Sequence, residues 1–204
     1  DAVSAARAVI QTGEYDFAWN IQVEDEVLQR LEKGGKGKAL FAVGGDIEFI
    51  AINFTDPNTE IDGERSSIKT KHPILSDPRV RQALALLVDR ESIKKAIYGR
   101  AGRATANYLN GPEEFVSKNT KWEFSIEKAA ALLDQAGWKA GSDGIREKDG
   151  KKLKLLYQTS INGPRQKTQA IVKQACQKAG IDVELKSVVA IVWSFQRFQF
   201  ECCF

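Results

Sequence analysis

Apolar and polar positions along the first 54 residues follow helical and extended patterns in turn. Helical spacing is clearest over 1–13 and 24–35, and both segments end in glycine, which favours a helix stop. Short extended patterns follow them at 15–19 and 38–43. The stretch 46–54 carries apolar residues on both of its faces, as a strand covered on both sides does. The sequence therefore predicts two helix and strand pairs followed by a covered strand.

The next helices are marked by local start and stop residues. Residues 55–76 come first; they are polar, turn-rich and aperiodic, which predicts a long surface loop. Asp77 can then cap a helix whose first turn suits Pro78. The apolar stripe of this helix consists of Val80, Ala83, Leu84, Leu87 and Val88. A shorter helix over 91–98 is expected to close at Gly99.

A further helix and two tight turns are predicted between residues 125 and 150. Ser125 can cap a helix whose apolar stripe is Ile126, Ala129, Ala130 and Leu133. Gly137 supplies a left-handed stop, with Trp138 placed to pack back onto the helix. Asp143-Gly144 and Asp149-Gly150 favour tight turns that lead into an extended segment.

The last third of the chain has the order strand, helix, glycine, strand. Residues 152–160 are extended, Pro164 opens a helix that Gly180 ends, and 181–188 alternate apolar and charged residues. This order predicts α/β layering, in which helices cover a sheet and the strands at 153–159 and 181–188 are neighbours.

Composition and charge exclude some classes of function. The chain has 204 residues, of which 43% are hydrophobic, enough for a buried core. Its 30 Lys and Arg nearly cancel 27 Asp and Glu and are scattered along the chain, so nucleic acid is not an expected partner. No apolar run reaches the roughly 20 residues that a membrane-spanning helix needs. The absence of Met leads us to expect that a preceding segment is not part of this sequence.

Candidate catalytic and metal-binding residues are few. His72 is the one histidine and has no Ser or Cys nucleophile motif beside it, so we interpret it as an exposed loop residue. The cysteines lack the close pairs of structural zinc sites and do not form a disulfide framework; they are Cys176, Cys202 and Cys203. The acidic and glycine positions around 141–150 fit a turn better than a calcium loop, and no glycine-rich phosphate motif is present. We expect no catalytic residue, no metal site and no cofactor.

Several segments resemble one protein family in residue identity, order and spacing. They are DPRVRQALALLVDRESIKKAIYG, NYLNGP, SIEKAAALLDQAGW, LYQTSI and GIDVELKS. Together they resemble the bacterial extracellular solute-binding proteins of family 5, which deliver dipeptides and oligopeptides to ABC importers. The resemblance implies a periplasmic-binding-protein-like α/β fold and an incomplete two-lobe architecture. It implies that 1–43 end the first lobe, that 44–188 form part of the second, peptide-binding lobe, and that 189–204 are an atypical tail.

The resemblance also implies a set of peptide contacts near the second lobe's first strand and along YQTSINGPR. By position these are Phe49, Asn53, Gln158, Ser160, Asn162 and Arg165. Other interpretations stay open: Phe49 can belong to the core, Asn53 and Asn162 can be turn residues, and Arg165 can be an exposed residue at a helix start.

The function implied is that of the substrate-binding component of a peptide importer. Two lobes would close on an extended peptide and present it to the membrane permease, in the periplasm or, in a Gram-positive-type cell, at the membrane's outer surface. The same fold could instead bind a nickel chelate, haem or an oligosaccharide, or a truncated lobe could have only an assembly role. The tail departs from the family and suggests a premature end or a frame change. Its aromatic residues could support self-association; they are Trp193, Phe195, Phe198, Phe200 and Phe204.

Overall fold

The computed structural model describes residues 2–19, 21, 23–42, 45–189 and 200–203, and the chain forms two compact units. Unit 1 comprises 1–45 and 90–117, and unit 2 comprises 46–89 and 118–204. The sequence-based division had placed 90–117 with the second lobe, whereas these residues cluster with the first 45. Which lobe of a two-lobe protein each unit represents remains a prediction.

Two helices form the first part of unit 1. Helices α1 (Ala2–Thr12) and α2 (Asp25–Gly34) confirm the sequence prediction. They pack through Ile10, Val23 and Leu28, which are buried together. The backbone carbonyl of Ile10 also accepts hydrogen bonds from the amides of Lys36 and Gly37, at 3.0 and 2.9 Å. These bonds hold the end of α1 against the segment that follows α2.

The two strands predicted in this region are wrong for the described residues. Residues 15–19 and 38–42 contain no strand, and Tyr15, Phe17 and Trp19 are exposed. An alternating pattern makes a strand only when a neighbouring strand supplies hydrogen bonds, and none of the described strands pairs with either segment.

The second part of unit 1 begins with α4 (Arg90–Ile93), which continues as a π-helical turn η1 (Lys94–Tyr98) and a 3₁₀ turn η2 (Gly99–Ala101). A later 3₁₀ turn is η3 (Glu113–Phe115). Gly99 has φ +46°, and a β-carbon there would collide with the carboxylate of Asp25. That carboxylate accepts from the backbone N and the side-chain Nε of Arg100, at 3.1 and 2.8 Å. The hydrogen bonds from Arg100 lower the pKa of buried Asp25.

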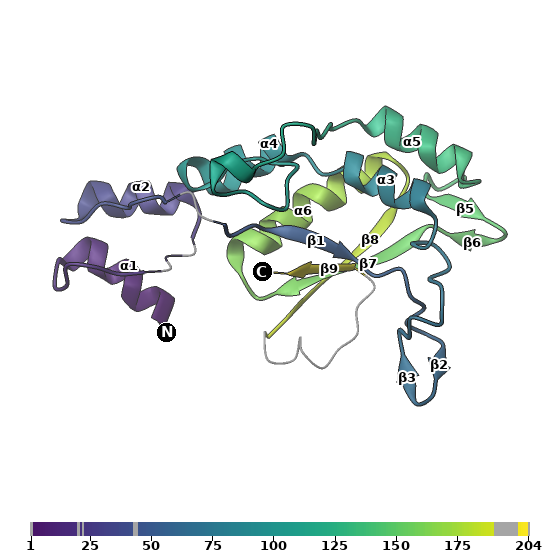
Figure 1. Cartoon of the computed structure of the whole chain (residues 1–204), viewed down its shortest axis with the longest axis horizontal. Coiled ribbons are helices and arrows are strands. Elements are labelled where there is room, and N and C mark those ends of the chain that lie inside the picture. The colour runs from purple at the N-terminus through teal and green to yellow at the C-terminus, as the bar shows by residue number, and fades with distance from the viewer. Residues whose placement is uncertain (1, 20, 22, 43–44, 190–199, 204) are drawn as a thin grey trace. The chain divides into compact units, whose positions relative to one another are not determined.

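A four-stranded sheet forms the centre of unit 2. Its order is β1 (Phe49–Ile52), β9 (Phe200–Cys203), β7 (Lys154–Ser160) and β8 (Asp182–Val188) (Figure 1). Strands β7 and β8 are parallel along their whole length. This confirms the predicted neighbours. Strand β9 is antiparallel to β1 and parallel to β7.

Helix α6 (Gly163–Lys178) makes the crossover between β7 and β8 and packs on both. Its buried face includes Thr168, Val172 and Ala175, as the spacing predicts. Gln169 is buried as well, and its Nε2 donates to the carbonyls of Tyr157 and Lys186, at 2.8 and 3.3 Å. One side chain of the helix therefore bonds to both parallel strands.

Helices α3 (Pro78–Leu86) and α5 (Ile126–Gln135) pack against each other in unit 2. Both start at the predicted caps: the carboxylate of Asp77 accepts from Arg79 N at 2.9 Å, and Ser125 Oγ accepts from Lys128 N at 3.1 Å. After α5, Gly137 has φ +90° and Trp138 N donates to the carbonyl of Leu133, which is the predicted stop.

A small antiparallel sheet follows α5. Its strands are β4 (Lys139–Ala140), β5 (Arg146–Lys148) and β6 (Lys151–Lys152), joined at the predicted Asp-Gly turns. The sequence did not indicate the role of Arg146. Its buried guanidinium donates to the carbonyls of Ala179 and Trp138, both at 2.7 Å, and to the Asp134 carboxylate at 2.8 Å. This one side chain ties the sheet to the ends of α5 and α6.

The loop predicted over 55–76 contains more structure than expected. It includes a hairpin of β2 (Glu60–Ile61) and β3 (Glu64–Arg65). The interpretation of His72 as exposed is wrong, since only 3% of it is exposed. Its Nδ1 accepts from the backbone amides of Ile74 and Leu75, at 3.0 and 2.9 Å. His72 thus organises the turn before α3, and burial lowers its pKa.

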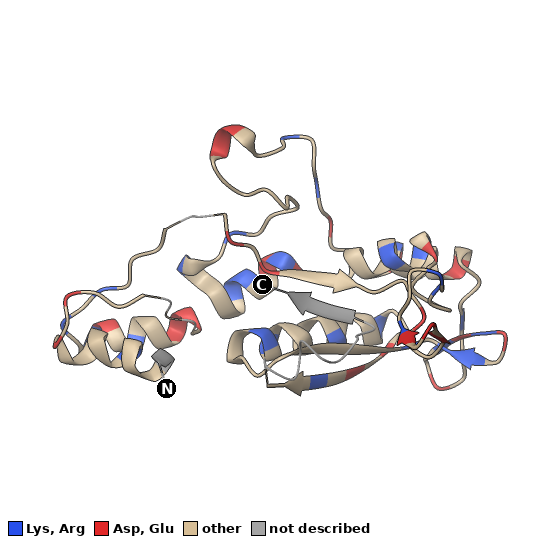
Figure 2. Cartoon of the chain, turned by 60° about the horizontal axis from the view of Figure 1, so that its bottom comes forward, with Lys and Arg blue, Asp and Glu red and all other residues tan. Residues whose placement is uncertain are grey.

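Most of the tail falls outside the described residues, including Trp193, Phe195, Phe198 and Phe204, on which the self-association prediction depends. The backbone of 200–203 forms β9. Among the described residues, no helix combines the length and apolar character that crossing a bilayer requires. Basic and acidic residues occur close to one another on the helices and loops of each unit (Figure 2).

Candidate functional site

Three consecutive polar residues are buried at the carboxyl end of β7. They are Gln158, Thr159 and Ser160, with 1%, 0% and 6% of their surfaces exposed. In open α/β sheets, ligands bind in the crevice outside the carboxyl ends of the strands. Polar side chains buried at that edge are therefore candidates for a binding site.

Two of these side chains lack a hydrogen-bond partner among the described residues. They are the amide Nε2 of Gln158 and the hydroxyl of Thr159. A buried polar group without a partner costs about 1–3 kcal/mol, so few are retained in folded proteins without a reason. The Gln158 amide offers a donor, and its natural complement is an acceptor such as a carbonyl oxygen.

Arg165 connects this edge to the strand on the other side of the sheet. Its Nε donates to Glu48 Oε1 at 2.8 Å, and its Nη1 donates to Ser160 Oγ at 3.0 Å. Only 4% of Arg165 is exposed, so the interpretation as an exposed residue at a helix start is wrong. Asn162 caps the same helix, since its Oδ1 accepts from Arg165 N at 3.1 Å.

These contacts define what Arg165 and Asn162 do in the described structure. The Arg165 guanidinium fixes the residue before β1 to the last residue of β7, and Asn162 orients the start of α6 that carries it. Glu48 is a part of this arrangement that the sequence did not suggest. A contact between Arg165 and a peptide carboxylate remains a prediction, and Glu48 already occupies one edge of its guanidinium.

The two other predicted contacts lie at opposite ends of β1, which β9 separates from β7: Phe49 follows Glu48, the partner of Arg165, and Asn53 follows the far end of the strand. Phe49 is half-buried in β1. Asn53 follows the strand, and its Oδ1 accepts from the amide and the hydroxyl of Thr55, at 3.0 and 2.6 Å. Its Nδ2 donates to Ser66 Oγ at 3.4 Å. These are the bonds of a turn residue, and contacts of Phe49 and Asn53 with a ligand remain predictions.

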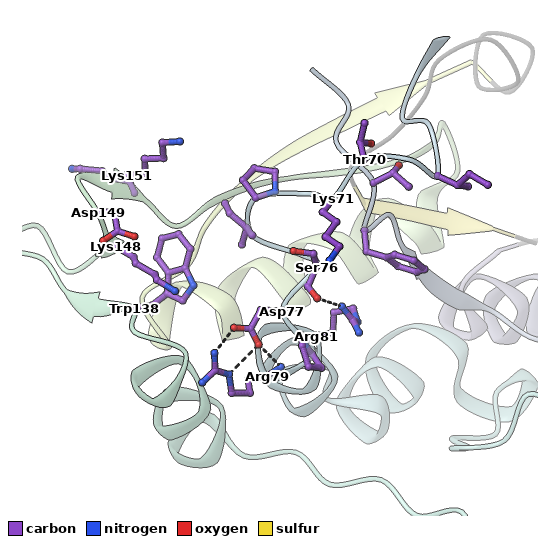
Figure 3. Close-up of a pocket in the computed structure, with 17 residues that line it drawn as sticks. Thr70, Lys71, Ser76, Asp77, Arg79, Arg81, Trp138, Lys148, Asp149 and Lys151 are labelled. Carbon is purple, nitrogen blue, oxygen red and sulfur yellow. Dashed lines mark hydrogen bonds and ion pairs between the residues drawn. The ribbon is translucent and has the colours of Figure 1, made fainter. Parts of the chain in front are cut away.

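A separate open groove of about 1050 Å³ lies elsewhere in unit 2 (Figure 3). None of the six predicted contact residues lines it. Its walls come from the loop before α3, the start of α3, and the small sheet β4–β6. The lining residues are Phe54, Thr55, Ile68, Thr70, Lys71, Pro73, Ile74, Ser76, Asp77, Pro78, Arg79, Arg81, Trp138, Lys148, Asp149, Lys151 and Lys152.

The described part of the chain contains few groups suited to acid–base catalysis or metal binding. No group of three or more potential metal ligands occurs there. The Nδ1 of His72 is taken up by two backbone amides. Cys176 is buried, and burial raises the pKa of its thiol to about 12, so it is not a thiolate near neutral pH.

Comparison with known proteins gives consistent results. The family described as bacterial extracellular solute-binding proteins, family 5, middle, matches residues 1–201. The chain is 32% identical over 166 residues to the oligopeptide-binding protein AppA of Bacillus subtilis (strain 168), covering 71% of this chain and 30% of AppA.

Two solved structures extend the comparison. AppA from Bacillus subtilis in complex with a nonapeptide is similar with a TM-score of 0.73 at 25% identity, covering 98% of this chain and 38% of that one. NikZ from Campylobacter jejuni in complex with Ni(L-His) is similar with a TM-score of 0.67 at 25% identity, covering 80% and 30%. The chain therefore spans about a third of the length of these relatives.

Proposed function

The chain belongs to the bacterial extracellular solute-binding proteins of family 5, and from this premise we propose that it is part of the peptide-binding component of an ABC importer. Its fold, a part of a periplasmic-binding-protein-like α/β architecture, is the one expected from the sequence. The family's members bind solutes for transporters and are not enzymes. Oligopeptide binding by AppA supports the choice of peptide as the solute.

The observation that carries the proposal is the unpartnered amide of Gln158 at the carboxyl end of β7. An extended peptide presents a regular row of backbone carbonyls, and a fixed amide donor can bind one of them whatever the side chains are. Binding would thereby satisfy a buried donor that is costly in the free protein. The Thr159 hydroxyl also lacks a partner among the described residues, but it belongs to the opposite face of β7.

Arg165 has a positioning role in this proposal. By holding Glu48 and Ser160 together it fixes the edge of the sheet on which Gln158 lies, so the amide is already oriented when the ligand arrives. Orientation in advance reduces the entropy that binding costs. Ser160 and Asn162 are then part of the frame around the ligand.

The whole importer component would enclose its peptide by closure of two lobes, of which unit 2 would provide one wall. Hydrated pockets around the ligand would accommodate different side chains. The closed form would dock on the membrane permease, outside the cytoplasmic membrane. Because one wall offers only part of the contacts, we expect this chain alone to bind peptide weakly, with Kd on the order of 1 mM.

A second candidate ligand is a nickel–histidine chelate, which the similarity to NikZ favours. A carboxylate oxygen of the histidine in such a chelate could accept from the same donor at Gln158. The described residues contain no metal-ligand cluster of their own, so the chelate would have to bring its own ligands.

The test is an NMR titration of the isotope-labelled chain with a pool of unmodified pentapeptides. We expect the side-chain amide of Gln158 and the backbone amides of 159–162 to shift progressively and weakly. Gln158→Leu should remove these shifts, because it removes the donor and keeps the volume. Gln174→Leu, at an exposed position of α6, is the matched control and should leave them unchanged.

Two results would contradict peptide binding at this edge. One is a set of peptide-induced shifts that persists in the Gln158→Leu chain. The other is paramagnetic broadening of residues 158–162 by the nickel–histidine complex with no response to peptides, which would support the second candidate.

A further inference from the structure

The open groove of unit 2 carries an unbalanced charge. Six of its lining side chains are basic and two are acidic. Of the basic ones, Arg79 is neutralised by Asp77 at 2.6 Å, and Lys152 by Asp143. Among the described residues the other four form no ion pair, and Asp149 is the one further acidic side chain in the lining, so the groove keeps an excess of positive charge that attracts anionic groups.

Two lysines account for the most accessible part of this charge. Lys71 and Lys151 are exposed, and their side-chain ammonium groups have no ion pair or hydrogen bond within the described parts of the chain. Lys151 lies with Lys148 and Trp138 on one side of the groove, and Lys71 lies with Thr70 on the other (Figure 3). An anionic chain between them could contact both.

Two further cations are held in place by neutral partners. Arg81 Nη1 donates to the carbonyls of Leu75 and Ser76, at 2.8 and 2.9 Å, and Lys148 Nζ donates to the carbonyl of Ala136 at 2.8 Å. Carbonyls orient these groups without cancelling their charge. Two cations of the groove are therefore held in place by hydrogen bonds, which favours recognition of a defined anionic arrangement.

The walls of the groove are also partly apolar. Phe54 is 58% exposed, with the Arg81 guanidinium over its ring at 5.5 Å, and Ile68 is 94% exposed. Large apolar side chains exposed beside cations suit a ligand with an apolar anchor between acidic groups. The volume of about 1050 Å³ is at the upper limit of small-molecule sites, which usually measure about 300–1,000 Å³.

We propose that this groove is a docking site for an acidic segment of a partner protein, with an apolar or aromatic residue at its centre. A segment can enter the groove and contact cations on opposite sides, whereas a flat anionic membrane reaches only the outermost lysines. The site is separate from the edge at Gln158, so the proposal does not depend on which solute is transported.

Fluorescence anisotropy with the 204-residue chain tests this proposal. The probe is a labelled nonapeptide of Glu and Asp with a central Phe and blocked termini, and its control has Gln and Asn in place of the acids. We expect the acidic probe to bind more tightly than the neutral control, which should show only the weak backbone binding proposed at Gln158, and to bind more weakly as salt rises. Lys71→Glu with Lys151→Glu should weaken it about ten-fold, since two ion pairs become repulsions.

The matched control is Lys118→Glu with Lys121→Glu, which changes two exposed lysines of unit 2 outside the groove and gives the same net charge. It should change the affinity less than about two-fold, and so should Gln158→Leu. Circular dichroism checks that each variant folds. If the double Lys→Glu variant of the groove does not fold, Lys71→Gln with Lys151→Gln takes its place.

Three outcomes would overturn the proposal. One is equal binding of the neutral peptide, and another is an equal loss in the control variant, which would mean attraction by net charge. The third is binding to phosphatidylglycerol vesicles through Lys71 and Lys151 without binding to the acidic peptide, which would identify a membrane contact.

Discussion

Single side chains bring together parts of this chain that are distant in sequence. Arg165 pairs with Glu48, 117 residues away, and Arg146 bonds to Ala179 and Asp134. Both guanidiniums are buried and use several donors, which is the geometry that favours Arg over Lys. In the described structure such residues fix the positions of the strand and helix ends that they join.

His72 makes the stability of the fold depend on pH. Burial lowers its pKa below 6.5, and its neutral Nδ1 accepts two amides. As pH falls below 6.5, the unfolded chain takes up the proton more readily than the folded chain, so the free energy of unfolding decreases. The stabilisation that neutral His72 gives to the fold is complete above pH 6.5. It is lost progressively as the pH falls from there toward the pKa of His72 in the folded chain. Urea unfolding at pH 7 and pH 5 measures it.

The variant His72→Asn separates this effect from other titrations. Its Oδ1 can accept the same amides but does not titrate, so the decrease between pH 7 and pH 5 should become smaller. Carboxylates whose pKa values are lowered in the fold, such as Asp25 and Asp77, affect stability mainly below this range. An unchanged pH dependence in His72→Asn would contradict the role assigned to His72.

At the scale of elements, the connections of the small sheet and α6 depend on left-handed glycines. Gly180 has φ +85°, and a β-carbon there would lie 2.8 Å from Arg146 Cγ. Gly180→Ala should therefore combine backbone strain with displacement of Arg146 and destabilise the chain by about 2–3 kcal/mol. Urea denaturation followed by circular dichroism measures the loss.

Gly150→Ala is the control for strain alone. Gly150 also has a left-handed conformation, with φ +73°, but a β-carbon there meets nothing within 4 Å. It should cost about 1–2 kcal/mol. Equal losses in the two variants would show that the Arg146 contact adds nothing to the strain.

The elements that could be predicted are those specified by local residues. Asp77, Ser125 and Gly137 act at the ends of helices, where cap and stop bonds span only a few residues, and all three do what their residue types indicate. The strands expected at 15–19 and 38–43 are wrong over the described residues 15–19 and 38–42, because a strand depends on a distant partner that its own pattern does not reveal.

The candidate site was predictable in position but not in its contacts. Gln158 and Ser160 were proposed by their position in the segment YQTSINGPR of the family resemblance, and the structure places them at the carboxyl end of β7, where ligand contacts remain a prediction. The partner of Arg165, the burial of His72 and the charged groove depend on residues that the fold brings together from distant parts of the sequence. For Glu48, the sequence indicated only that an acidic residue occurs within the predicted covered strand at 46–54.

At the scale of the whole molecule, the two proposals assign different ligands to two different places in unit 2. The edge at Gln158 offers uncharged donors, which suit a ligand recognised by its backbone. The groove beside α3 offers cations and apolar side chains, which suit an acidic segment. A receptor that accepts varied peptides and also docks on a protein needs both kinds of recognition.

Photo-crosslinking tests the peptide site most directly. A pentapeptide with a benzophenone side chain at its centre is irradiated with the 204-residue chain, and the attachment sites are mapped by mass spectrometry. Peptide binding at Gln158 predicts crosslinks within 158–162 and near Glu48, which unlabelled peptides compete for and Gln158→Leu reduces. Crosslinks confined to the groove residues 68–81 and 138–152, or to unit 1, would contradict it.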